Sequence, residues 1–500
     1  MRTEILVVGG GLGGVAAALA AARAGRDVVL TEPTDWVGGQ LTAQAVPPDE
    51  HPWIERFGCT ASYRALREGI RAHYRAHYPL TAAARATADL NPGAGRVSAL
   101  CCEPRAALAV LEAMLGPSPR LVRHAPVAAA VEGDHVKAVT LRGPEGEITV
   151  EADWVIDATE TGELLALAGC EHVTGIESQA MTGEPHAPAR ARPESIQAPT
   201  WCFALDHRPG EDHTIGRPAG YERWRSHLGW LAPDPKTGVL TPRRLEPNPD
   251  GDPAALGFDR EDDEGDRELW TFRRIAARAN FAPGAYASDI TIANWPQLDC
   301  ETGDADDARE LSLSFLHWLQ AEQGLEGLRL RGDVTGTHDG LAKALYVRES
   351  RRIRAEHTIV EHELGMRHAD SVGIGSYRID LHPRTGGEGY LDVHAPPFEI
   401  PLGALVPVRM ENLLPGAKNL GTTHITNGCH RLHPVEWNVG EVAGALAAFC
   451  AQRRSRPREV RARPALRDAF RERLARDGVE LSWPAAVRER RGVRAARVKR

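Results

Sequence analysis

The chain opens with an apolar run, a glycine-rich turn and a long stretch of small apolar residues. Residues 5–8 (Ile-Leu-Val-Val) have the pattern of a strand buried on both faces of a parallel sheet. Residues 9–14 follow as a turn, and residues 15–24 form an Ala-rich segment that predicts a helix. Gly25 ends this helix, and residues 27–31 predict a second strand. The pattern therefore indicates a β-α-β unit at the start of a parallel sheet.

Glycines within the turn have the spacing G-x-G-x-x-G, at Gly9, Gly11 and Gly14. Gly9 permits a tight turn, Gly11 lets the backbone approach a pyrophosphate, and Gly14 lets the helix pack closely on the strand. The positive amino end of the helix at residues 15–24 then faces the pyrophosphate. Glu32 follows the second strand, where a carboxylate accepts hydrogen bonds from ribose hydroxyls and selects against a 2′-phosphate. These residues predict a dinucleotide site for FAD or NAD.

The segment after Glu32 distinguishes between these two cofactors. It resembles the E-x(5)-G-G-x-x-T continuation of glutathione-reductase-type flavoproteins, with Gly38, Gly39 and Thr42 at the matching positions. In those proteins the paired glycines pass under the FAD pyrophosphate and the residues after them approach the flavin. The resemblance thus implies FAD, with Gly38, Gly39 and Gln40 as cofactor contacts. Without the resemblance, the two glycines are a simple turn.

A hairpin and a buried strand come next among the recognisable elements. Residues 136–150 alternate between apolar and polar side chains around a Gly-Pro-Glu-Gly turn, which predicts a hairpin. Residues 154–159 form an apolar strand that ends in small residues. This strand resembles the second FAD motif of the same proteins, whose end runs near the adenosine half of the cofactor. The resemblance implies Asp157, Ala158 and Thr159 as cofactor contacts.

Later stretches resemble a broad bacterial family of FAD-dependent oxidoreductases. Residues 160–169 are similar to its G-D-L-A-x-x-A-G stretch, with Glu163 where Asp is usual, and residues 175–186 are similar to the loop that follows. Residues 412–420 are similar to the strand N-L-L-V-A-G-x-x-I, with which such proteins close the FAD domain. This last segment implies Asn419 as a further cofactor contact.

The segment at residues 422–434 is similar to the T-H-x-x-x-G-x-x-R-x-x-P segment of this family, which lies near the flavin ring. A helix is expected from about residue 438 to residue 450, with Gly440 and Gly444 on one face. Its positive amino end would face the flavin pyrimidine and favour the negative charge that develops at N1 and O2 on reduction. Gly440 is therefore expected among the cofactor-binding residues.

Taken in order, these segments predict an α/β fold with a discontinuous cofactor domain. The domain is Rossmann-like, of the glutathione-reductase type, and takes residues 1–189 and 335–450, with a substrate-facing strand region at 371–400. Residues 190–334 form an inserted α+β substrate or cap domain. Residues 451–500 are expected as a basic C-terminal helical extension and tail, whose last dozen residues are disordered.

The expected cap mixes strand-like pieces, such as residues 288–293, with Pro- and acid-rich loops at 247–253 and 259–266. Its tryptophans either stack on a planar substrate or, as large aromatic side chains usually do, pack in a core; they are Trp201, Trp224, Trp230, Trp270, Trp295 and Trp318. After the cap, residues 341–364 have a helical pattern. The arginines at 348–354 either bind an anion or form ion pairs on a solvated helix face.

Composition narrows the choice of compartment and partner. The chain has 500 residues, too many for one ordinary core, and no apolar stretch approaches the length of a bilayer span. Its net charge of −8 argues against nucleic acid or acidic lipid as a partner. Its eight cysteines include no C-x-x-C pair, which argues against a metal or iron–sulfur site and favours a reducing cytoplasm. A homo-oligomer stays open.

Histidines near the expected flavin ring are the candidate proton acceptors. Removal of a hydride from an alcohol or amine goes with loss of a proton, and an imidazole suits that step. The resemblance implies His424 beside the isoalloxazine, with His433 as the second histidine and Arg431 as a stabiliser of an anion or oxyanion. Asp380 and His382 lie two apart on an expected strand, so they share a face and can act together.

These features favour one function and leave two alternatives. The favoured function is an FAD-dependent oxidoreductase that transfers a hydride between flavin N5 and a small polar organic substrate: an alcohol, a sugar or a carboxylate. The electron acceptor is not specified. The first alternative is an NAD(P)H-using flavin reductase or monooxygenase, although no second G-x-G-x-x-G opens another nucleotide unit. The second is an RNA-modifying or RNA-binding flavoprotein, against which the negative net charge argues. Cys59 and Cys429 are expected to be buried, inert thiols.

Overall fold

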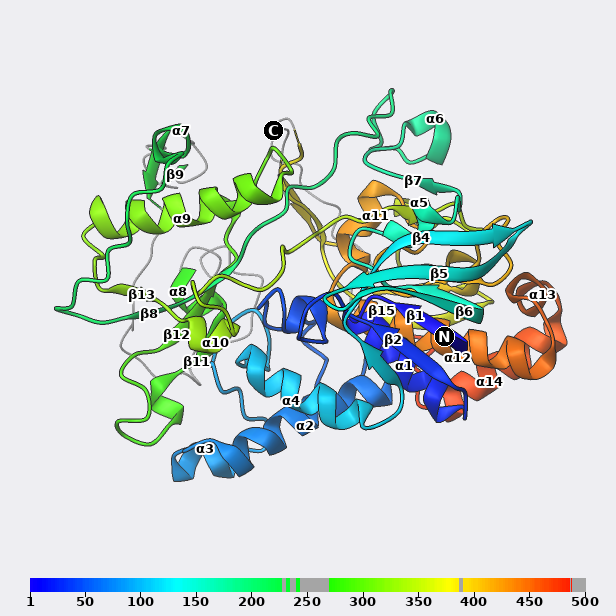
Figure 1. Ribbon diagram of the computed structural model, residues 1–500, viewed down its shortest axis with the longest axis horizontal. Coiled ribbons are helices and arrows are strands. Elements are labelled where there is room, and N and C mark those ends of the chain that lie inside the picture. The colour runs from blue at the N-terminus through cyan, green and yellow to red at the C-terminus, as the bar shows by residue number, and fades with distance from the viewer. Residues whose placement is uncertain (227–230, 234–239, 243–268, 386–389, 486, 488–500) are drawn as a thin grey trace.

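A seven-stranded sheet forms the centre of the computed structural model, which describes residues 1–226, 231–233, 240–242, 269–385, 390–485 and 487. β3, β2, β1, β6 and β19 run parallel in that order, and β5 and β4 continue from the other end of β6 as an antiparallel hairpin (Figure 1). The strands are β1 (Arg2–Val8), β2 (Val28–Thr31), β3 (Arg120–Val122), β4 (Ala125–Glu132), β5 (His135–Gly143), β6 (Gly146–Asp157) and β19 (Leu413–Pro415).

Helices from both ends of the chain pack on this sheet. α1 contacts α12 along its length and also contacts α4, so the first helix lies against one of the last (Figure 1). The α-helices are α1 (Leu12–Arg23), α2 (Ala61–His77), α3 (Ala82–Ala86), α4 (Pro104–Leu115), α5 (Glu163–Leu167), α6 (Gln179–Thr182), α7 (Tyr221–Arg225), α8 (Leu269–Phe272), α9 (Ala305–Ala321), α10 (Gly332–Thr335), α11 (His424–His430), α12 (His433–Arg453), α13 (Pro457–Ala462) and α14 (Pro464–Arg476). Short 3-10 helices include η1 (Gly39–Leu41), η5 (Arg278–Asn280), η6 (Pro296–Leu298), η7 (Glu361–Glu363) and η8 (Leu402–Leu405).

The parallel strand order confirms the Rossmann-like α/β fold predicted from the sequence. β1 lies between β2 and β6, so the strand order reverses beside β1, and ligands of such sheets bind outside the carboxyl ends of the strands at that point. β19 pairs with β6 from Leu413 beside Val155 to Pro415 beside Asp157. Segments more than 250 residues apart in the sequence therefore build one sheet edge. The expected hairpin and the buried strand after it are continuous, because β6 runs unbroken from Gly146 to Asp157.

A second, antiparallel sheet has its own hydrophobic core. Its order is β11 (Arg274–Ala276), β12 (Ile290–Ala293), β8 (Phe203–His207) and β13 (Leu328–Leu330), and α9 packs beside it (Figure 1). Trp224, Trp270, Trp295 and Trp318 are buried in this core, as large aromatic side chains usually are. Trp201 packs, partly buried, against both the main core and this one, whereas Trp230 lies outside the described residues. The exact division of the chain into domains stays a prediction.

Shorter strand pairs complete the structure. β15 pairs antiparallel with β18, β16 with β17, and β14 with β7. Their bounds, with those of a further pair, are β7 (His172–Val173), β9 (Leu231–Pro233), β10 (Leu240–Pro242), β14 (Arg352–Ile353), β15 (Ser371–Gly375), β16 (Ile379–Leu381), β17 (Leu391–Val393) and β18 (Phe398–Pro401).

The prediction of a long helix at residues 341–364 is wrong. This segment is extended and irregular, with β14 and the short η7 as its regular parts. Its backbone makes isolated bridges instead, among them Thr200 with Tyr346 and Ile359 with Thr422. Arg348 and Arg352 are fully buried and hydrogen-bonded, so tertiary contacts override the local helical pattern.

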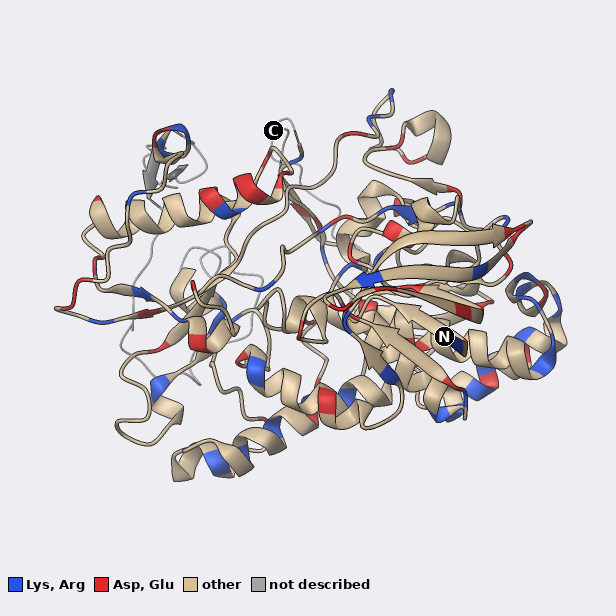
Figure 2. Ribbon diagram, viewed as in Figure 1, with Lys and Arg blue, Asp and Glu red and all other residues tan. Residues whose placement is uncertain are grey.

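The C-terminal extension docks through apolar side chains, as expected. Phe470 and Leu474 of α14 are buried, and Trp483 lies in an aromatic cluster with Trp53 and Phe57. Figure 2 shows basic residues gathered on α13 and α14. The expected disorder of the last dozen residues, and the loops at 247–253 and 259–266, lie outside the described residues. Within the part of the chain that the structure describes, no helix combines the length and the hydropathy needed to span a bilayer.

The crossing of α1 and α12 depends on glycine. A Cβ added at Gly440 would lie 1.9 Å from the carbonyl oxygen of Gly13, and one at Gly444 would lie 2.1 Å from that of Ala17. We expect Gly440→Ala to lower the free energy of unfolding by about 1–3 kcal/mol or more, since about 1–3 kcal/mol is the usual cost of overpacking. The cost is not relieved locally, because the atoms that the new methyl group meets belong to the backbone. Denaturant unfolding measures this change. The control is Gly216→Ala, where no atom lies within 4 Å of the new methyl group; an equal loss in both variants would contradict the argument.

Candidate functional site

The glycine turn between β1 and α1 is as tight as its spacing predicts. Gly9 has φ of +102°, and a Cβ there would lie 2.3 Å from the carbonyl oxygen of Ala158 at the end of β6. A Cβ at Gly14 would lie 1.9 Å from the carbonyl oxygen of Gly9, so α1 packs directly on the turn. Gly11, the N-cap residue of α1, has no side chain with which to cap the helix. The turn therefore presents backbone N–H groups at the sheet's switch point, where a pyrophosphate binds in this type of fold.

The second pair of glycines lies against the first turn. Gly38 and Gly39 both have positive φ, and the N–H of Gly38 donates to the carbonyl oxygen of Gly10 at 2.7 Å. A Cβ at Gly39 would lie 2.8 Å from the Cα of Gly11. The two groups of glycines, both predicted to contact a pyrophosphate, thus meet around one point.

Glu32 lies at the carboxyl end of β2 and is 6% exposed. Its Oε1 accepts hydrogen bonds from the N–H and the hydroxyl of Thr34, at 2.8 and 2.7 Å. Burial raises the pKa of Glu32 to about 7, although the bonds from Thr34 act in the opposite direction. A buried carboxylate beside the glycine turn suits the binding of ribose hydroxyls, which donate hydrogen bonds without adding charge.

Asp157 and Asn419 hold the ends of β6 and β19 together. Asp157 Oδ1 accepts from the N–H of Thr159 at 2.9 Å and from its hydroxyl at 2.7 Å. Asn419 Nδ2 donates to the carbonyl oxygen of Asp157 at 2.9 Å, and its Oδ1 accepts from the N–H of Ala417 at 3.1 Å. These side chains fix the strand ends on which the glycine turn rests, and Ala158 contributes its carbonyl oxygen beside Gly9.

His424 forms a buried dyad with Glu349. The ring is 2% exposed at the start of α11, and its Nδ1 lies 3.1 and 3.0 Å from the two carboxylate oxygens of Glu349. Its Nε2 is buried and has no hydrogen-bond partner among the described residues. Although burial alone would raise it, His424 and Arg352 hold the pKa of Glu349 at about 2. The carboxylate therefore stays ionised and fixes the ring, with Nε2 left for a reacting group.

Glu349 was not predicted from the sequence, where only the arginines of that segment suggested a role. Glu349 also accepts from Arg352, which in turn binds Glu177 at 2.8 Å, and Glu177 accepts from the N–H of His424 at 2.9 Å. The only hint in the sequence was an acidic residue inside the R-E-S-R-R run. Its pairing with His424 depends on a contact across 75 residues.

Arg431 begins a buried chain of ion pairs. Its Nη2 donates to Asp380 Oδ2 at 2.9 Å, and His382 Nε2 lies 3.3 Å from the same oxygen. His382 Nδ1 then lies 2.7 Å from Asp299, and Asp299 pairs with Arg348 at 2.9 Å. Although burial alone would raise it, His382 and Arg431 hold the pKa of Asp380 well below its usual range. Asp380 and His382 are thus neighbours in space, as the strand pattern predicted.

His433 is occupied by the backbone, unlike His424. Its Nδ1 accepts from the N–H of Asp49 at 3.2 Å, and its Nε2 donates to the carbonyl oxygen of Val46 at 3.1 Å. Burial lowers the pKa of His433 to about 4, so the ring is neutral near pH 7. Both ring nitrogens are thus used in bonds to the backbone, which argues against the expected catalytic role of His433, and that role stays a prediction.

The helix expected from about residue 438 begins at His433 instead. Gly440 consequently lies two turns inside α12, against Gly13, and not at the helix end that was expected to face the flavin. Cys59 and Cys429 are buried free thiols, as predicted. Burial raises the pKa of Cys59 to about 12 and that of Cys429 still further, which suppresses the thiolate.

Several buried polar atoms of this region have no hydrogen-bond partner among the described residues. They include Gln40 Oε1, Ser350 Oγ, Asp380 Oδ1, Thr422 Oγ1, His424 Nε2, Asn427 Nδ2, His430 Nε2, Arg431 Nε and Asn438 Nδ2. Buried polar atoms left unpaired by the protein indicate a place for water or a ligand. Together with the glycine cradle and the buried carboxylate of Glu32, they fit a dinucleotide that runs from the turn toward His424.

A family model described as FAD dependent oxidoreductase matches residues 4–474. The chain belongs to this family. The oxidoreductase is therefore an enzyme, and FAD is its cofactor. The match spans both halves of the parallel sheet and the second sheet between them. Groups of side chains suited to a metal ion are absent from the part of the oxidoreductase that the structure describes.

Solved flavoenzymes resemble the oxidoreductase only distantly. The anhydrotetracycline hydroxylase OxyS from Streptomyces rimosus is 14% identical, with 96% of this chain and 68% of its own covered and a TM-score of 0.36. A geranylgeranyl bacteriochlorophyll reductase-like protein from Thermoplasma acidophilum is 11% identical, with 96% and 84% covered and a TM-score of 0.33. CabE, an aromatic hydroxylase from angucycline biosynthesis, is 19% identical, with 50% and 47% covered and a TM-score of 0.27. The chain thus spans about half of CabE, and none of these similarities informs its substrate.

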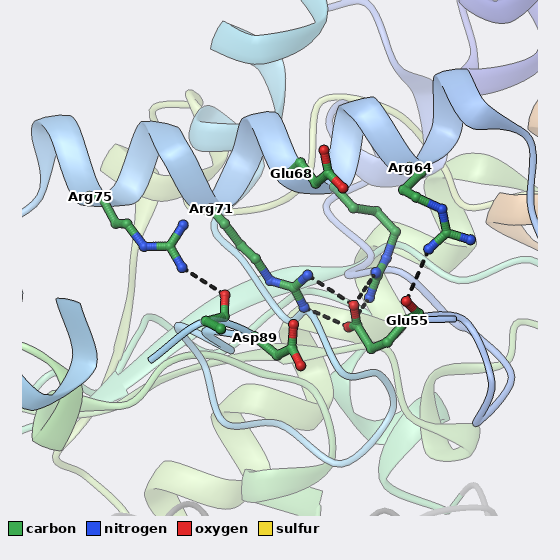
Figure 3. A pocket seen from close by; sticks show the side chains of 8 residues that line it. Glu55, Arg64, Glu68, Arg71, Arg75 and Asp89 are labelled. Carbon is green, nitrogen blue, oxygen red and sulfur yellow. Dashed lines mark hydrogen bonds and ion pairs between the residues drawn. The ribbon is translucent and has the colours of Figure 1, made fainter. Parts of the chain in front are cut away.

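A polar cavity of about 260 Å³ lies along α2 of the oxidoreductase. Figure 3 shows Arg64, Arg71 and Arg75 on one face of this helix, above Glu55 and Asp89. The arginines already donate to protein oxygens: Arg71 to Glu55, Arg75 to two backbone carbonyls and Arg64 to two others. The cavity is therefore a structural ion-pair cluster that joins α2 to the loops beside it.

Glu55 makes the stability of this cluster depend on pH. Although burial alone would raise it, Arg67 and Arg71 lower the pKa of Glu55 from 4.5 to about 2. A carboxyl group whose pKa falls on folding stabilises the protein fully above its unfolded pKa and loses that contribution as the pH falls. We expect wild-type stability to drop between about pH 5 and pH 2 more steeply than that of Glu55→Gln, as measured by denaturant unfolding across this range. Parallel pH profiles for the two proteins would contradict the assignment.

Proposed function

We propose that this oxidoreductase transfers a hydride between flavin N5 and a small polar organic substrate: an alcohol, a sugar or a carboxylate. The observation that carries the proposal is the Glu349–His424 dyad, which leaves a buried imidazole nitrogen without a protein partner among the described residues. An enzyme that only passes electrons between cofactors has no need of such a group. Oxidation of an alcohol or a hydroxy acid does need one, because a proton must leave with the hydride.

The residues that we assign to the cofactor divide between its two ends. Gly9, Gly11 and Gly14 receive the pyrophosphate on the amino end of α1, with Gly38 and Gly39 on its other side. The close approach of the two glycine pairs supports this assignment. At the adenosine end, Glu32 binds the ribose hydroxyls, and Asp157, Ala158, Thr159 and Asn419 form the supporting strand ends. Gln40 lies on the flavin side, since its amide donates to the carbonyl oxygen of Arg431 at 3.2 Å.

Bound FAD supplies a two-electron acceptor, and the chain's own residues handle the proton. In the oxidation of an alcohol, the carbon loses its C–H electrons and hydrogen as a hydride, and the hydroxyl loses its proton to His424 Nε2. The C–O bond thereby becomes a carbonyl. Glu349 holds the Nδ1–H of His424 and stabilises the imidazolium that forms. In the reverse reaction, the same imidazolium returns the proton.

Arg431 is assigned to the substrate oxygen or carboxylate. Its Nη2 is held by Asp380, while its Nε is buried and has no partner among the described residues. A guanidinium fixed in this way stabilises negative charge on a substrate without having to reorganise. Because Arg431 and His424 are almost wholly buried, their interactions with a substrate would take place away from bulk water, where they are stronger.

Anaerobic reduction of the bound flavin tests the proposal. The purified enzyme is mixed with a panel of alcohols, sugars and hydroxy acids, and loss of the oxidised flavin absorbance is followed; we expect at least one of these compounds to reduce the flavin. Reduction by NADH or NADPH alone, with none of the organic compounds active, would contradict hydride transfer from such a substrate and favour a reductase or monooxygenase. Tight binding of transfer RNA at physiological salt would favour the RNA-modifying alternative.

A further inference from the structure

A carboxylate from the far end of the chain lies on the amino end of α1. Glu436, in the first turns of α12, accepts a hydrogen bond from the N–H of Gly13 at 3.2 Å. This N–H belongs to the first turn of α1, whose N-cap residue Gly11 provides no side chain of its own. Such free N–H groups are the ones that receive a pyrophosphate in a dinucleotide fold. An anionic side chain thus already occupies part of the proposed pyrophosphate site.

A second carboxylate converges on the same point. A Cβ added at Gly11 would lie 3.2 Å from Oε1 of Glu160 and 3.2 Å from Oε1 of Glu436. A Cβ at Gly39 would lie 2.8 Å from Oε1 of Glu160. Both acids therefore face the small space where the two glycine pairs meet, although they come from segments after β6 and within α12.

Only one of these two carboxylates, Glu160, has a direct ion pair with the neighbouring cation Lys418. Lys418, in the segment after β19, forms an ion pair with Glu160 at 2.5 Å and also donates to the carbonyl oxygen of Val347. Glu436 receives the neutral amide of Gln40 from η1 and the N–H of Gly13 from α1. His433, in the first turn of the same helix, is neutral and bound to the backbone. Burial raises the pKa of Glu436 to about 7, although Lys418 acts in the opposite direction.

A pyrophosphate brings two negative charges to this point. Ionised Glu436 would then face a like charge at contact distance in a buried site, where repulsion between like charges disfavours both ionised groups. A protonated Glu436 instead carries an O–H group, which donates to a phosphate oxygen. The same residue thus changes from acceptor at the helix end to donor toward the ligand.

We infer that FAD binding is coupled to the uptake of one proton from solvent by Glu436, whose carboxylic acid then donates a hydrogen bond to the pyrophosphate. No covalent bond forms or breaks in this step other than the O–H bond of the acid. This inference rests on FAD as the cofactor but not on the proposed hydride transfer, so it holds or fails whatever the substrate is.

Calorimetry with the full-length apoprotein tests the inference. FAD is titrated into the protein at about pH 8 in buffers of different ionisation enthalpy, and the dependence of the heat on the buffer gives the number of protons exchanged. We expect close to one proton taken up per FAD bound. We also expect the Kd for FAD, followed by flavin fluorescence, to rise by up to tenfold per pH unit above about pH 7. If the heat of FAD binding did not depend on the buffer, and the Kd for FAD stayed constant from pH 6.5 to 8.5, the wild-type data alone would overturn the inference.

Matched variants assign the proton to one residue. Glu436→Gln keeps a donor in place of the acid, so we expect it to bind FAD without proton uptake and with a Kd that no longer rises with pH. Glu160→Gln is the control, because Glu160 is already paired with Lys418, and this variant should keep the uptake. Loss of uptake in Glu160→Gln but not in Glu436→Gln would reject Glu436 as the site. Thermal unfolding of each apoprotein shows whether the variant folds. If Glu436→Gln does not fold, the calorimetry of the wild-type protein still tests the inference.

Discussion

His424→Ala is expected to retain FAD and to reduce it about 10²–10⁴-fold more slowly with the substrate that works best in the wild-type enzyme. This is the range that a positioned general base contributes to a proton transfer. The ring is held by Glu349 through Nδ1, so its Nε2 is aimed in one direction and costs little reorganisation when it accepts the proton. The Ala variant removes that acceptor but leaves the glycine turn and Glu32 untouched, which is why the cofactor should stay bound.

Stopped-flow reduction under anaerobic conditions measures this effect, and the flavin content of the purified variant shows whether FAD is retained. His430→Gln is the matched control, because His430 is a buried histidine of the same helix that contacts a backbone carbonyl and has no carboxylate partner among the described residues. Glu349→Gln should reduce the flavin at a rate between those of His424→Ala and His430→Gln. It should also shift the pH dependence of that rate, since a neutral amide stabilises the His424 imidazolium less than a carboxylate does. A rate for His424→Ala equal to that of the wild type would remove His424 from the mechanism.

Arg67→Ala should destabilise the oxidoreductase by about 3–5 kcal/mol, the usual cost of leaving a buried partner charge uncompensated. The Arg67 guanidinium is almost wholly buried and binds Glu50 at 2.9 Å and Glu55 at 2.6 Å. Glu50 is itself buried, so after the substitution it keeps the hydroxyls of Tyr63 and Ser98 but loses its cation. The loss should appear as a lower denaturant midpoint.

Arg75→Ala is the control for this experiment. Arg75 lies on the same face of α2, but it is only half-buried, and among the described residues its guanidinium donates to the carbonyl oxygens of Thr87 and Ala88 in exposed contacts (Figure 3). We expect its unfolding free energy to stay within about 1 kcal/mol of the wild type, because exposed polar contacts contribute little. If the two variants lost the same stability, the burial of the ion pair would not be the cause.

The cofactor end of the fold was predictable because its signals are local. The spacing of Gly9, Gly11 and Gly14 requires a tight turn and close helix packing, and both requirements are visible in a short stretch of sequence. The pairing of β19 with β6 was accessible only through resemblance, since no local pattern connects residues so far apart. The start of α12 was misplaced because Pro434 looks like a helix breaker, whereas it lies in the first turn, where a proline is tolerated.

The catalytic end was less predictable, because it consists of long-range ion pairs. Residues 341–364 carry the spacing of an amphipathic helix, yet Arg348, Glu349 and Arg352 all face a buried network and the chain extends to reach it. Charge patterns along one segment cannot reveal partners that come from residues 177, 299 and 424. His424 itself was proposed from its motif, whereas the Glu349 carboxylate that contacts it was not.

The pairing of β19 with β6 also determines when the cofactor site can exist during synthesis. The glycine turn is made about 400 residues before β19 and α12, but its helix packs against α12 and β19 pairs with β6 of its sheet. These contacts have a very high sequence separation, so the nascent chain must keep its first β-α-β unit from misassembling while the whole middle of the protein is made. FAD can therefore find its complete site only after β19 and α12 have been made, so the cofactor can take part in folding only from that point on.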